Sequence, residues 1–183
     1  MTDNRIFKER RDLSIIGWDK TVSLYSDNGL ELEVACMGSE LVVHLIIDGQ
    51  DVMSSSRSEH TCMEKAVAKC PENARVLVGG LGYGMVLLYL AESKKTKEVI
   101  IIEIDDRVLK LFENPISSYL KNNYPDFTFK IIKGDIHEEM NKHGLFDWVY
   151  TDITEGMPPK LRESALKALT PNGIFTDFYE TTL

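Results

Sequence analysis

The chain has 183 residues, of which 43% are hydrophobic and 27% charged, and its formal net charge at pH 7 is -8. This size and composition are typical of one globular domain with a small appendage, and no apolar run approaches the roughly 20 residues that a membrane helix needs. The charged start of the chain lacks an export signal and the acidic surface repels phosphate, so we expect a cytoplasmic protein with no nucleic acid and no membrane partner.

Residues 1–52 are predicted to form a small β-rich extension. Runs rich in β-branched and aromatic residues are separated by turn residues, and they cover 12–18, 20–26, 30–37 and 41–49. A helix is expected to follow within 54–70, with Ser58 as its N-cap.

Residues 53–183 alternate between predicted strands and helices. Apolar strands are expected at 76–80, 98–105, 127–135, 147–153 and 173–179, with helices at 85–93, 107–123 and 160–169. Pro115 is expected to interrupt the second of these helices, and Pro171-Asn172-Gly173 to end the third. Apolar strands separated by helices indicate an α/β fold whose parallel sheet is covered on both faces, with ligands at the carboxyl ends of the strands.

A glycine-rich turn, Gly79-Gly80-Leu81-Gly82-Tyr83-Gly84, follows the first of these strands and leads into a helix. Glycine lets the backbone approach a ligand closely, and the free N–H groups of a helix N-terminus attract a carboxylate or a phosphate. A nicotinamide dinucleotide remains an alternative ligand, although the spacing is G-x-G-x-G rather than G-x-G-x-x-G.

Acidic residues lie at the carboxyl ends of the next three predicted strands. Glu103 lies about 20 residues after the glycines, where a carboxylate can accept both ribose hydroxyls. Asp135 is placed to accept from an adenine amino group, with Ile136 covering the ring. Asp152 follows the fourth strand, beside the position of a reacting group. Helix capping is the alternative role for Glu103, for Asp105 and for Asp135.

The sequences GGLGYG, IIEID, KGD and FDWVYTD, in this order and spacing, resemble class I S-adenosylmethionine-dependent methyltransferases, and within them the spermidine synthase group. The resemblance covers roughly residues 40–178 and implies a Rossmann-like class I methyltransferase sheet, truncated here after the fifth strand. It implies S-adenosylmethionine, or its decarboxylated form, as the cofactor. The implied cofactor-binding residues are Gly80, Leu81, Gly82, Gly84, Glu103, Ile104, Asp135, Ile136 and Asp152.

The chain departs from the spermidine synthase pattern at three places in the amine pocket. The D-x-x-D pair of that group, which deprotonates the amine, reads Asp152-Ile153-Thr154-Glu155 here. Its Tyr-His pair falls on Cys62 and Met63, and an acidic residue of its glycine turn is Tyr83. These departures argue against polyamine synthesis.

The segment DVMSSSRSEHTCMEKAVA also resembles guanidinoacetate and arginine N-methyltransferases, which carry V-M-M-x-W-E-x-P-Y-M before a similar glycine turn. The matching residues are Val52, Met53, Glu59 and Met63. By this resemblance Glu59 and Asp152 would bracket a cationic nitrogen, and one of them could take its proton. The alternative for Glu59 is a first-turn residue favoured by the helix dipole.

Three functions stay open besides dinucleotide binding. The first is a methyltransferase acting on a small molecule, through an amine or another nucleophile, with Asp152, Glu59 and Glu155 as catalytic residues and no metal. The second is an aminopropyltransferase with an altered amine pocket, and the third is a cofactor-binding protein without turnover. The last predicted strand would be an exposed edge unless a partner covers it, so we expect a homodimer.

Overall fold

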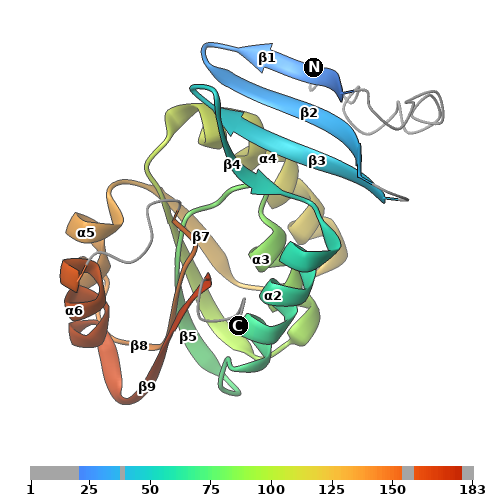
Figure 1. The fold of residues 1–183 in the computed structure, drawn as a ribbon. Coiled ribbons are helices and arrows are strands. Elements are labelled where there is room, and N and C mark those ends of the chain that lie inside the picture. Colours follow the sequence, from blue (N-terminus) through green and yellow to red (C-terminus); the bar gives the residue numbers. More distant parts are fainter. Residues whose placement is uncertain (1–20, 38–39, 154–158, 179–183) are drawn as a thin grey trace. The chain divides into compact units, whose positions relative to one another are not determined.

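The computed structural model describes residues 21–37, 40–153 and 159–178. The chain divides into two compact units, Met1–Glu59 and His60–Leu183, each of which has its own sheet (Figure 1). The sequence-based boundary between residues 52 and 53 stays a prediction, and the predicted strand at 12–18 lies outside the described residues. In the described part of the chain, no helix is long and apolar enough to cross a membrane.

The first unit contains a four-stranded antiparallel sheet of order β1-β2-β3-β4. Its strands are β1 (Thr21–Asp27), β2 (Leu30–Met37), β3 (Glu40–Ile47) and β4 (Gln50–Ser54). Asn28-Gly29 and Asp48-Gly49 have positive φ, as tight hairpin turns require. β4 was not predicted from the sequence, because it is short, has only Val52 and Met53 as apolar residues, and is held by its pairing with β3.

Helix α2 (Arg57–Ala68) begins two residues earlier than the predicted N-cap at Ser58 implies. The N–H group of Glu59 donates to Ser56 Oγ at 3.4 Å, so Ser56 is the N-cap. The prediction of Ser58 as the N-cap is wrong. Ser58 lies inside the first helical turn, where its hydroxyl contacts Ser56 Oγ at 2.8 Å.

The second unit contains a five-stranded parallel sheet of order β7-β6-β5-β8-β9. Its strands are β5 (Ala74–Gly79), β6 (Thr96–Glu103), β7 (Phe129–Lys133), β8 (Phe146–Thr151) and β9 (Leu169–Asp177). The helices are α3 (Met85–Ser93), α4 (Asp106–Asn123), α5 (Ile136–Glu139) and α6 (Pro159–Lys167), with a short 3-10 helix, η3 (Met140–Lys142), after α5. Figure 1 shows α5 and α6 on one side of this sheet and α3 and α4 on the other, which confirms the predicted α/β fold.

Pro115 does not interrupt α4, contrary to the sequence-based prediction. Proline removes one backbone hydrogen bond and favours a helix end, but buried residues on both sides can hold the helix together. Val108 and Leu109 are buried before Pro115, and Leu120 is buried after it, while Pro115 itself is exposed. Tertiary packing therefore outweighs the local preference.

Pro171-Asn172-Gly173 does not form the end of α6, which stops at Lys167. The three residues lie inside β9, where the pairing with β8 jumps from Phe146↔Leu169 to Trp148↔Ile174. Proline is tolerated there because it occupies a bulge of an edge strand. In the described part of the chain β9 pairs only with β8, and the expected homodimer stays a prediction.

Candidate cofactor-binding site

The glycine-rich turn between β5 and α3 has a backbone that other residues rarely adopt. Gly80, Gly82 and Gly84 have φ angles of 93°, 49° and 79°. A Cβ atom on Gly80 would lie 2.8 Å from the carbonyl oxygen of Asp152, and one on Gly84 would lie 2.7 Å from Ile116 Cδ1. Gly80 therefore has no room for a side chain unless the main chain moves, whereas at Gly84 the side chain of Ile116 would have to shift.

The turn leads directly into the N-terminus of α3. Gly84 is the N-cap residue and contributes no side-chain cap, while its own N–H group donates to the carbonyl oxygen of Leu81 at 2.7 Å. The first N–H groups of a helix have no partner within the helix and carry a partial positive charge. This end of α3 is therefore suited to a carboxylate or phosphate group.

Glu103 ends β6 and connects this strand to the glycine-rich turn. Its side chain is 7% exposed. Oε2 accepts from the N–H group of Leu81 at 2.8 Å, and Oε1 accepts from that of Asp105 at 2.8 Å. The carboxylate thus lies beside the turn, as the sequence predicted, and it also holds the turn in place. Each oxygen can still accept a further hydrogen bond.

Ile104 and Asp105 follow Glu103 and have different roles. Ile104 is 66% exposed, although it lies next to the buried end of β6. Asp105 is the N-cap of α4, and its carboxylate accepts from the N–H group of Arg107 at 2.8 Å and pairs with the guanidinium of the same residue. These bonds with Arg107 hold the pKa of Asp105 below its usual value. Asp105 therefore caps a helix, the alternative role that the sequence left open for it.

Asp135 and Ile136 follow the carboxyl end of β7. Asp135 is the N-cap of the short helix α5, and Oδ1 accepts from the N–H group of His137 at 2.8 Å. Ile136 is 8% exposed, and its Cγ1 lies 3.2 Å from where a Cβ atom on Gly79 would be. Asp135 therefore acts as a helix cap, and its adenine-binding role and that of Ile136 stay predictions.

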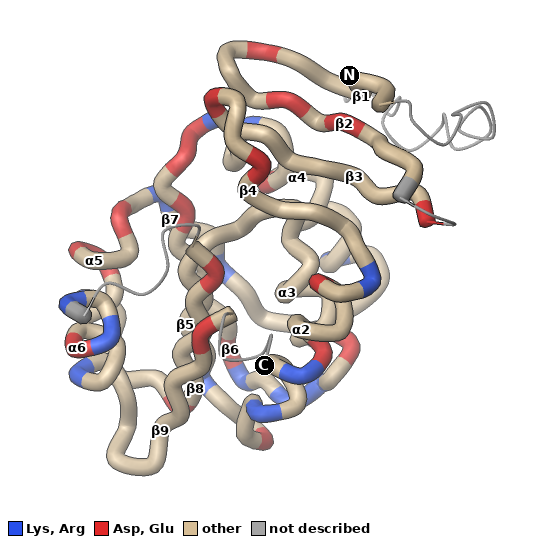
Figure 2. The backbone as a smooth tube through the Cα atoms, in the orientation of Figure 1, with Lys and Arg blue, Asp and Glu red and all other residues tan. Residues whose placement is uncertain are grey.

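Asp152 directly follows β8 and lies against the start of the glycine-rich turn. Its N–H group donates to the carbonyl oxygen of Gly79 at 3.1 Å, and its own carbonyl oxygen faces Gly80. From β5 the chain adds β6 and β7 on one side, and then β8 and β9 on the other side, so the order in which strands are added reverses between β5 and β8. Ligands of such sheets bind outside the carboxyl ends of the strands at that point. Glu103 ends β6 and Asp152 follows β8, the strands on either side of β5, so both residues lie at the same edge of the sheet as the turn. Figure 2 shows the acidic residues in red along the backbone of both units.

Glu59 and Glu155 were predicted as further catalytic residues. Glu155 lies outside the described residues. Glu59 belongs to the first unit, where Oε1 accepts from both the N–H group and the hydroxyl of Ser54 at 2.9 Å. Burial raises the pKa of Glu59, while the bonds from Ser54 oppose this shift. Glu59 thus ties the end of β4 to α2, and its pairing with Asp152 around a substrate stays a prediction.

The raised pKa of Glu59 has a measurable consequence. A carboxyl group with a raised pKa binds its proton more tightly in the folded state. This contribution to stability is complete below the ordinary glutamate pKa and is lost as the pH rises through the raised value. Glutamine cannot take up this proton. As the pH is lowered from the raised pKa to the ordinary one, we therefore expect the free energy of unfolding of Glu59→Gln to fall relative to that of wild type. Urea denaturation at several pH values checks this, with Glu113→Gln, an exposed position on α4, as the control that should show no such trend.

Sequence reasoning missed Thr151 and Asp177, two buried polar residues at this edge of the sheet. Asp177 ends β9 and is 4% exposed, and Thr151 ends β8 and is fully buried. They are register partners, and the Thr151 hydroxyl donates to Asp177 Oδ2 at 3.5 Å. The signal that could have revealed Asp177 was its position at a strand end, the same signal that pointed to Glu103.

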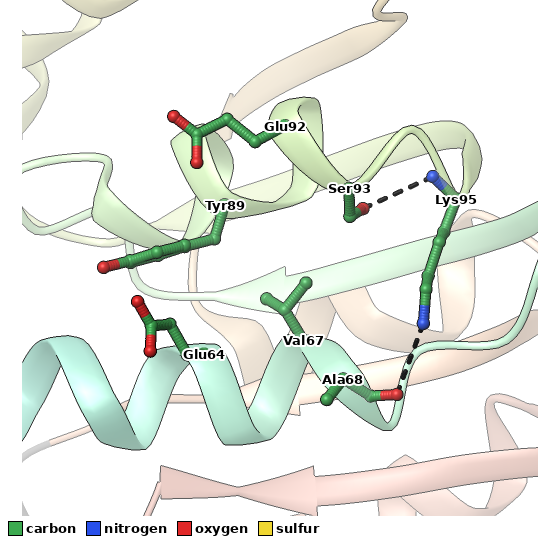
Figure 3. Close-up of a pocket in the computed structure, with 7 residues that line it drawn as sticks. All are labelled: Glu64, Val67, Ala68, Tyr89, Glu92, Ser93 and Lys95. Carbon is green, nitrogen blue, oxygen red and sulfur yellow. Dashed lines mark hydrogen bonds between the residues drawn. The ribbon is translucent and has the colours of Figure 1, made fainter.

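A separate groove of about 350 Å³ lies between α2 and α3 in the second unit (Figure 3). It is lined by Glu64, Val67, Ala68, Tyr89, Glu92, Ser93 and Lys95. Its residues on α3 come from the carboxyl-terminal half of the helix, whereas the glycine-rich turn precedes the first residue of α3. Lys95 Nζ donates to the Ala68 carbonyl oxygen at 3.4 Å, at the end of α2. The groove is therefore distinct from the candidate cofactor site.

No protein-family model and no curated protein matches this sequence. Solved structures do match. Spermidine synthase from Thermotoga maritima aligns with a TM-score of 0.60 and 19% identity, over 85% of this chain and 54% of that chain. A spermidine synthase in complex with the transition state analogue AdoDATO aligns with a TM-score of 0.64 and 16% identity, over 87% and 62% of the two chains. Precorrin-6y C5,15-methyltransferase from Geobacter metallireducens aligns with a TM-score of 0.54 and 11% identity, over 69% and 62%.

These similarities concern the fold. The chain spans between about half and three-fifths of the length of these three proteins. The four-stranded antiparallel sheet followed by a five-stranded parallel sheet matches the spermidine synthase architecture. The chain thus has the α/β fold that spermidine synthases share with class I S-adenosylmethionine-dependent methyltransferases.

Proposed function

We propose that this protein binds S-adenosylmethionine at the carboxyl edge of its parallel sheet and transfers the methyl group to a small amine acceptor. The glycine-rich turn carries the proposal. Positive φ angles at three alternate residues, a Gly80 position where a Cβ atom would meet main chain, and an uncapped helix N-terminus form a backbone cradle beside a buried carboxylate. Such a cradle suits a ligand with a carboxylate at one end and ribose hydroxyls further along.

The residues at the edge fit the parts of S-adenosylmethionine. The glycine-rich turn and the N-terminus of α3 would hold the methionine carboxylate. Glu103 would accept the ribose hydroxyls with the lone pairs that its two backbone bonds leave. Ile104, which is 66% exposed, would pack on the adenine ring, and Asp135 would accept from the adenine amino group.

When bound, the cofactor supplies a methyl group that its sulfonium already activates. The protein then has mainly to align the acceptor. Asp152 is the side chain best placed for this role, because its backbone is fixed against Gly79 and Gly80 at the start of the turn. Its carboxylate would orient an amine and take its proton as the new bond forms.

Aminopropyl transfer is the second candidate, because the similarity to spermidine synthases covers 85% and 87% of the chain. Cys62 and Met63 favour methyl transfer instead. They stand where the spermidine synthase pattern has its Tyr-His pair, and they are only 8% and 0% exposed. Two apolar side chains buried in α2 cannot bind a diamine.

Transfer assays with two cofactors separate these functions. The purified protein is incubated with a pool of small amines and one of two cofactors. The first is S-adenosylmethionine labelled in its methyl group, and the second is decarboxylated S-adenosylmethionine labelled in its aminopropyl group. We expect label in the amines only from the first cofactor. Label only from the second would replace methyl transfer by aminopropyl transfer. Calorimetric binding of S-adenosylmethionine without label from either cofactor would indicate a binding protein without turnover.

Asp152→Asn should separate catalysis from cofactor binding. The amide keeps the backbone contacts with the turn but cannot take a proton, so we expect turnover to fall at least about a hundredfold. The dissociation constant of S-adenosylmethionine should change by less than about threefold. Asp126→Asn, an exposed position before β7, is the control and should leave both quantities unchanged. Full turnover of Asp152→Asn would remove Asp152 from the proposed mechanism.

A further inference from the structure

Thr151, whose hydroxyl contacts Asp177, packs directly against Gly79, the first residue of the glycine-rich turn. Thr151 is the register partner of Gly79 on one side and of Asp177 on the other. Its Cγ2 atom lies 3.3 Å from where a Cβ atom on Gly79 would be, so the methyl group packs on the backbone of Gly79. Its hydroxyl donates to Asp177 Oδ2 at 3.5 Å.

One torsion angle of Thr151 sets both contacts. The methyl and hydroxyl groups of threonine are attached to the same carbon, so a rotation about χ1 moves them together. The carboxylate of Asp177 favours the rotamer that directs the hydroxyl to β9 and the methyl group to Gly79. Without this acceptor the other staggered rotamers become competitive, and each of them changes what lies against the turn.

Asp152, the residue after Thr151, contacts the first two residues of the turn. The Asp152 N–H group donates to the Gly79 carbonyl oxygen at 3.1 Å, and the Asp152 carbonyl oxygen lies 2.8 Å from a Cβ position on Gly80. A small shift at the end of β8 therefore changes the position of Gly80. Close packing of this kind leaves little freedom to absorb such a shift.

We propose that Asp177 is a positioning residue for the cofactor site. Through Thr151 it fixes the end of β8, and through β8 it fixes the start of the glycine-rich turn. The inference about affinity rests on the proposed function, while the inference about the backbone of the turn holds without a ligand.

The chain offers a matched control one residue away. Thr176 is also fully buried in β9, and its hydroxyl accepts from Trp148 Nε1 at 2.9 Å. Successive residues of a strand point to opposite faces of the sheet. Thr176 is therefore on the other face from Asp177, and its bond to Trp148 involves no residue of the turn.

Hydrogen exchange in the protein without ligand is the first test. The amides of Gly80 and Asp152 donate to Ile102 and Gly79 across the sheet, so their exchange rates report on the start of the turn. We expect Asp177→Leu and Thr151→Val to speed their exchange, relative to the amides of β6, about fivefold or more, as for the loss of one buried hydrogen bond. Thr176→Val also removes one buried hydrogen bond, so it should lower the free energy of unfolding about as much as Asp177→Leu does. It should not speed the exchange of the Gly80 and Asp152 amides relative to those of β6. Equal local effects of Asp177→Leu and Thr176→Val would overturn the proposal.

Calorimetric titration with S-adenosylmethionine is the second test. We expect Asp177→Leu to raise the dissociation constant about fivefold to tenfold. Asp177→Asn should stay within about twofold of wild type, since its amide oxygen can still accept from Thr151. The double variant Asp177→Leu/Thr151→Val should bind no more weakly than Asp177→Leu alone, because the bond between the two side chains is already lost in that single variant.

The outcomes distinguish the two proposals. A wild-type protein that binds no S-adenosylmethionine contradicts the proposed function, and the hydrogen-exchange result then decides on Asp177 alone. If the wild-type protein binds the cofactor, two results overturn the positioning role. One is that the losses of affinity add in the double variant, and the other is that Asp177→Asn binds as weakly as Asp177→Leu.

Discussion

Gly80→Ala is expected to raise the dissociation constant of S-adenosylmethionine at least about tenfold and to lower the free energy of unfolding by roughly 2 to 4 kcal/mol. Two effects add. Alanine is strained at a φ of 93°, and its Cβ atom would lie 2.8 Å from the backbone oxygen of Asp152. The oxygen is part of the main chain, so the contact is relieved only by a shift at the end of β8. Calorimetric titration and urea denaturation measure the two quantities.

Gly49→Ala is the matched control for this variant. Gly49 also has a positive φ, 79°, but nothing lies within 4 Å of a Cβ atom placed there. The control therefore measures backbone strain alone, which costs about 1 to 2 kcal/mol of stability. Cofactor affinity should not change. Equal effects of the two substitutions on stability and on affinity would show that the contact between Gly80 and Asp152 has no role.

Glu103→Gln is expected to have the second largest effect, a rise of the dissociation constant by about tenfold to a hundredfold. Both oxygens of Glu103 accept from backbone N–H groups, those of Leu81 and Asp105. Glutamine offers one oxygen and one NH₂ group, so one backbone donor would face another donor in a buried place. A ribose would also lose one of its acceptors. The loss of stability should be about 1 to 3 kcal/mol.

Glu98→Gln is the control for Glu103→Gln, because it makes the same change on the same strand. Glu98 pairs with Arg75 at 2.6 Å, with a side chain that is 38% exposed, and it lies near the other end of β6. Partly exposed ion pairs contribute little, so stability should fall by less than about 1 kcal/mol and affinity should stay at the wild-type value. If Glu103→Gln bound S-adenosylmethionine with wild-type affinity, Glu103 would only stabilise the turn and would not bind the ribose.

Gly80 and Glu103 hold the glycine-rich turn from opposite sides. Gly80 meets the end of β8, and Glu103 at the end of β6 bonds the residue after Gly80. The turn is thus held on both sides before any ligand binds. A cradle that is already formed loses less conformational entropy on binding, which favours affinity.

Several parts of the fold could be read from the sequence, because local pattern and tertiary structure agree there. Residues 85–93 were predicted as a helix and form α3 with the same limits. The alternation of apolar strands with helices predicted the parallel sheet, since strands covered on both faces need apolar side chains throughout. The strand-end placement of Glu103 and Asp152 followed from the same alternation.

Other parts depended on contacts between residues distant in sequence. β4 is short, with Val52 and Met53 as its only apolar residues, and forms by pairing with β3. Pro115 stays within α4 because buried residues on both sides hold the helix. The segment Pro171-Asn172-Gly173 reads as a helix end but forms a bulge, because β8 supplies the pairing on both sides of it. In each case a long-range contact outweighs a local preference of about 1 to 3 kcal/mol.

The sequence by itself determined the order of the elements, the parallel sheet and the glycine-rich turn with acidic residues after neighbouring strands. These features follow from periodicity and from the special backbone of glycine, which are local properties. Only the tertiary structure decided what each acid contacts: Glu103 bonds the turn, Asp105 and Asp135 cap helices, and Asp177 faces Thr151. The physical reason is that the hydrogen-bond donors available to a carboxylate at a strand end come from neighbouring strands and turns, and the distance to them is set by the packing of the whole sheet.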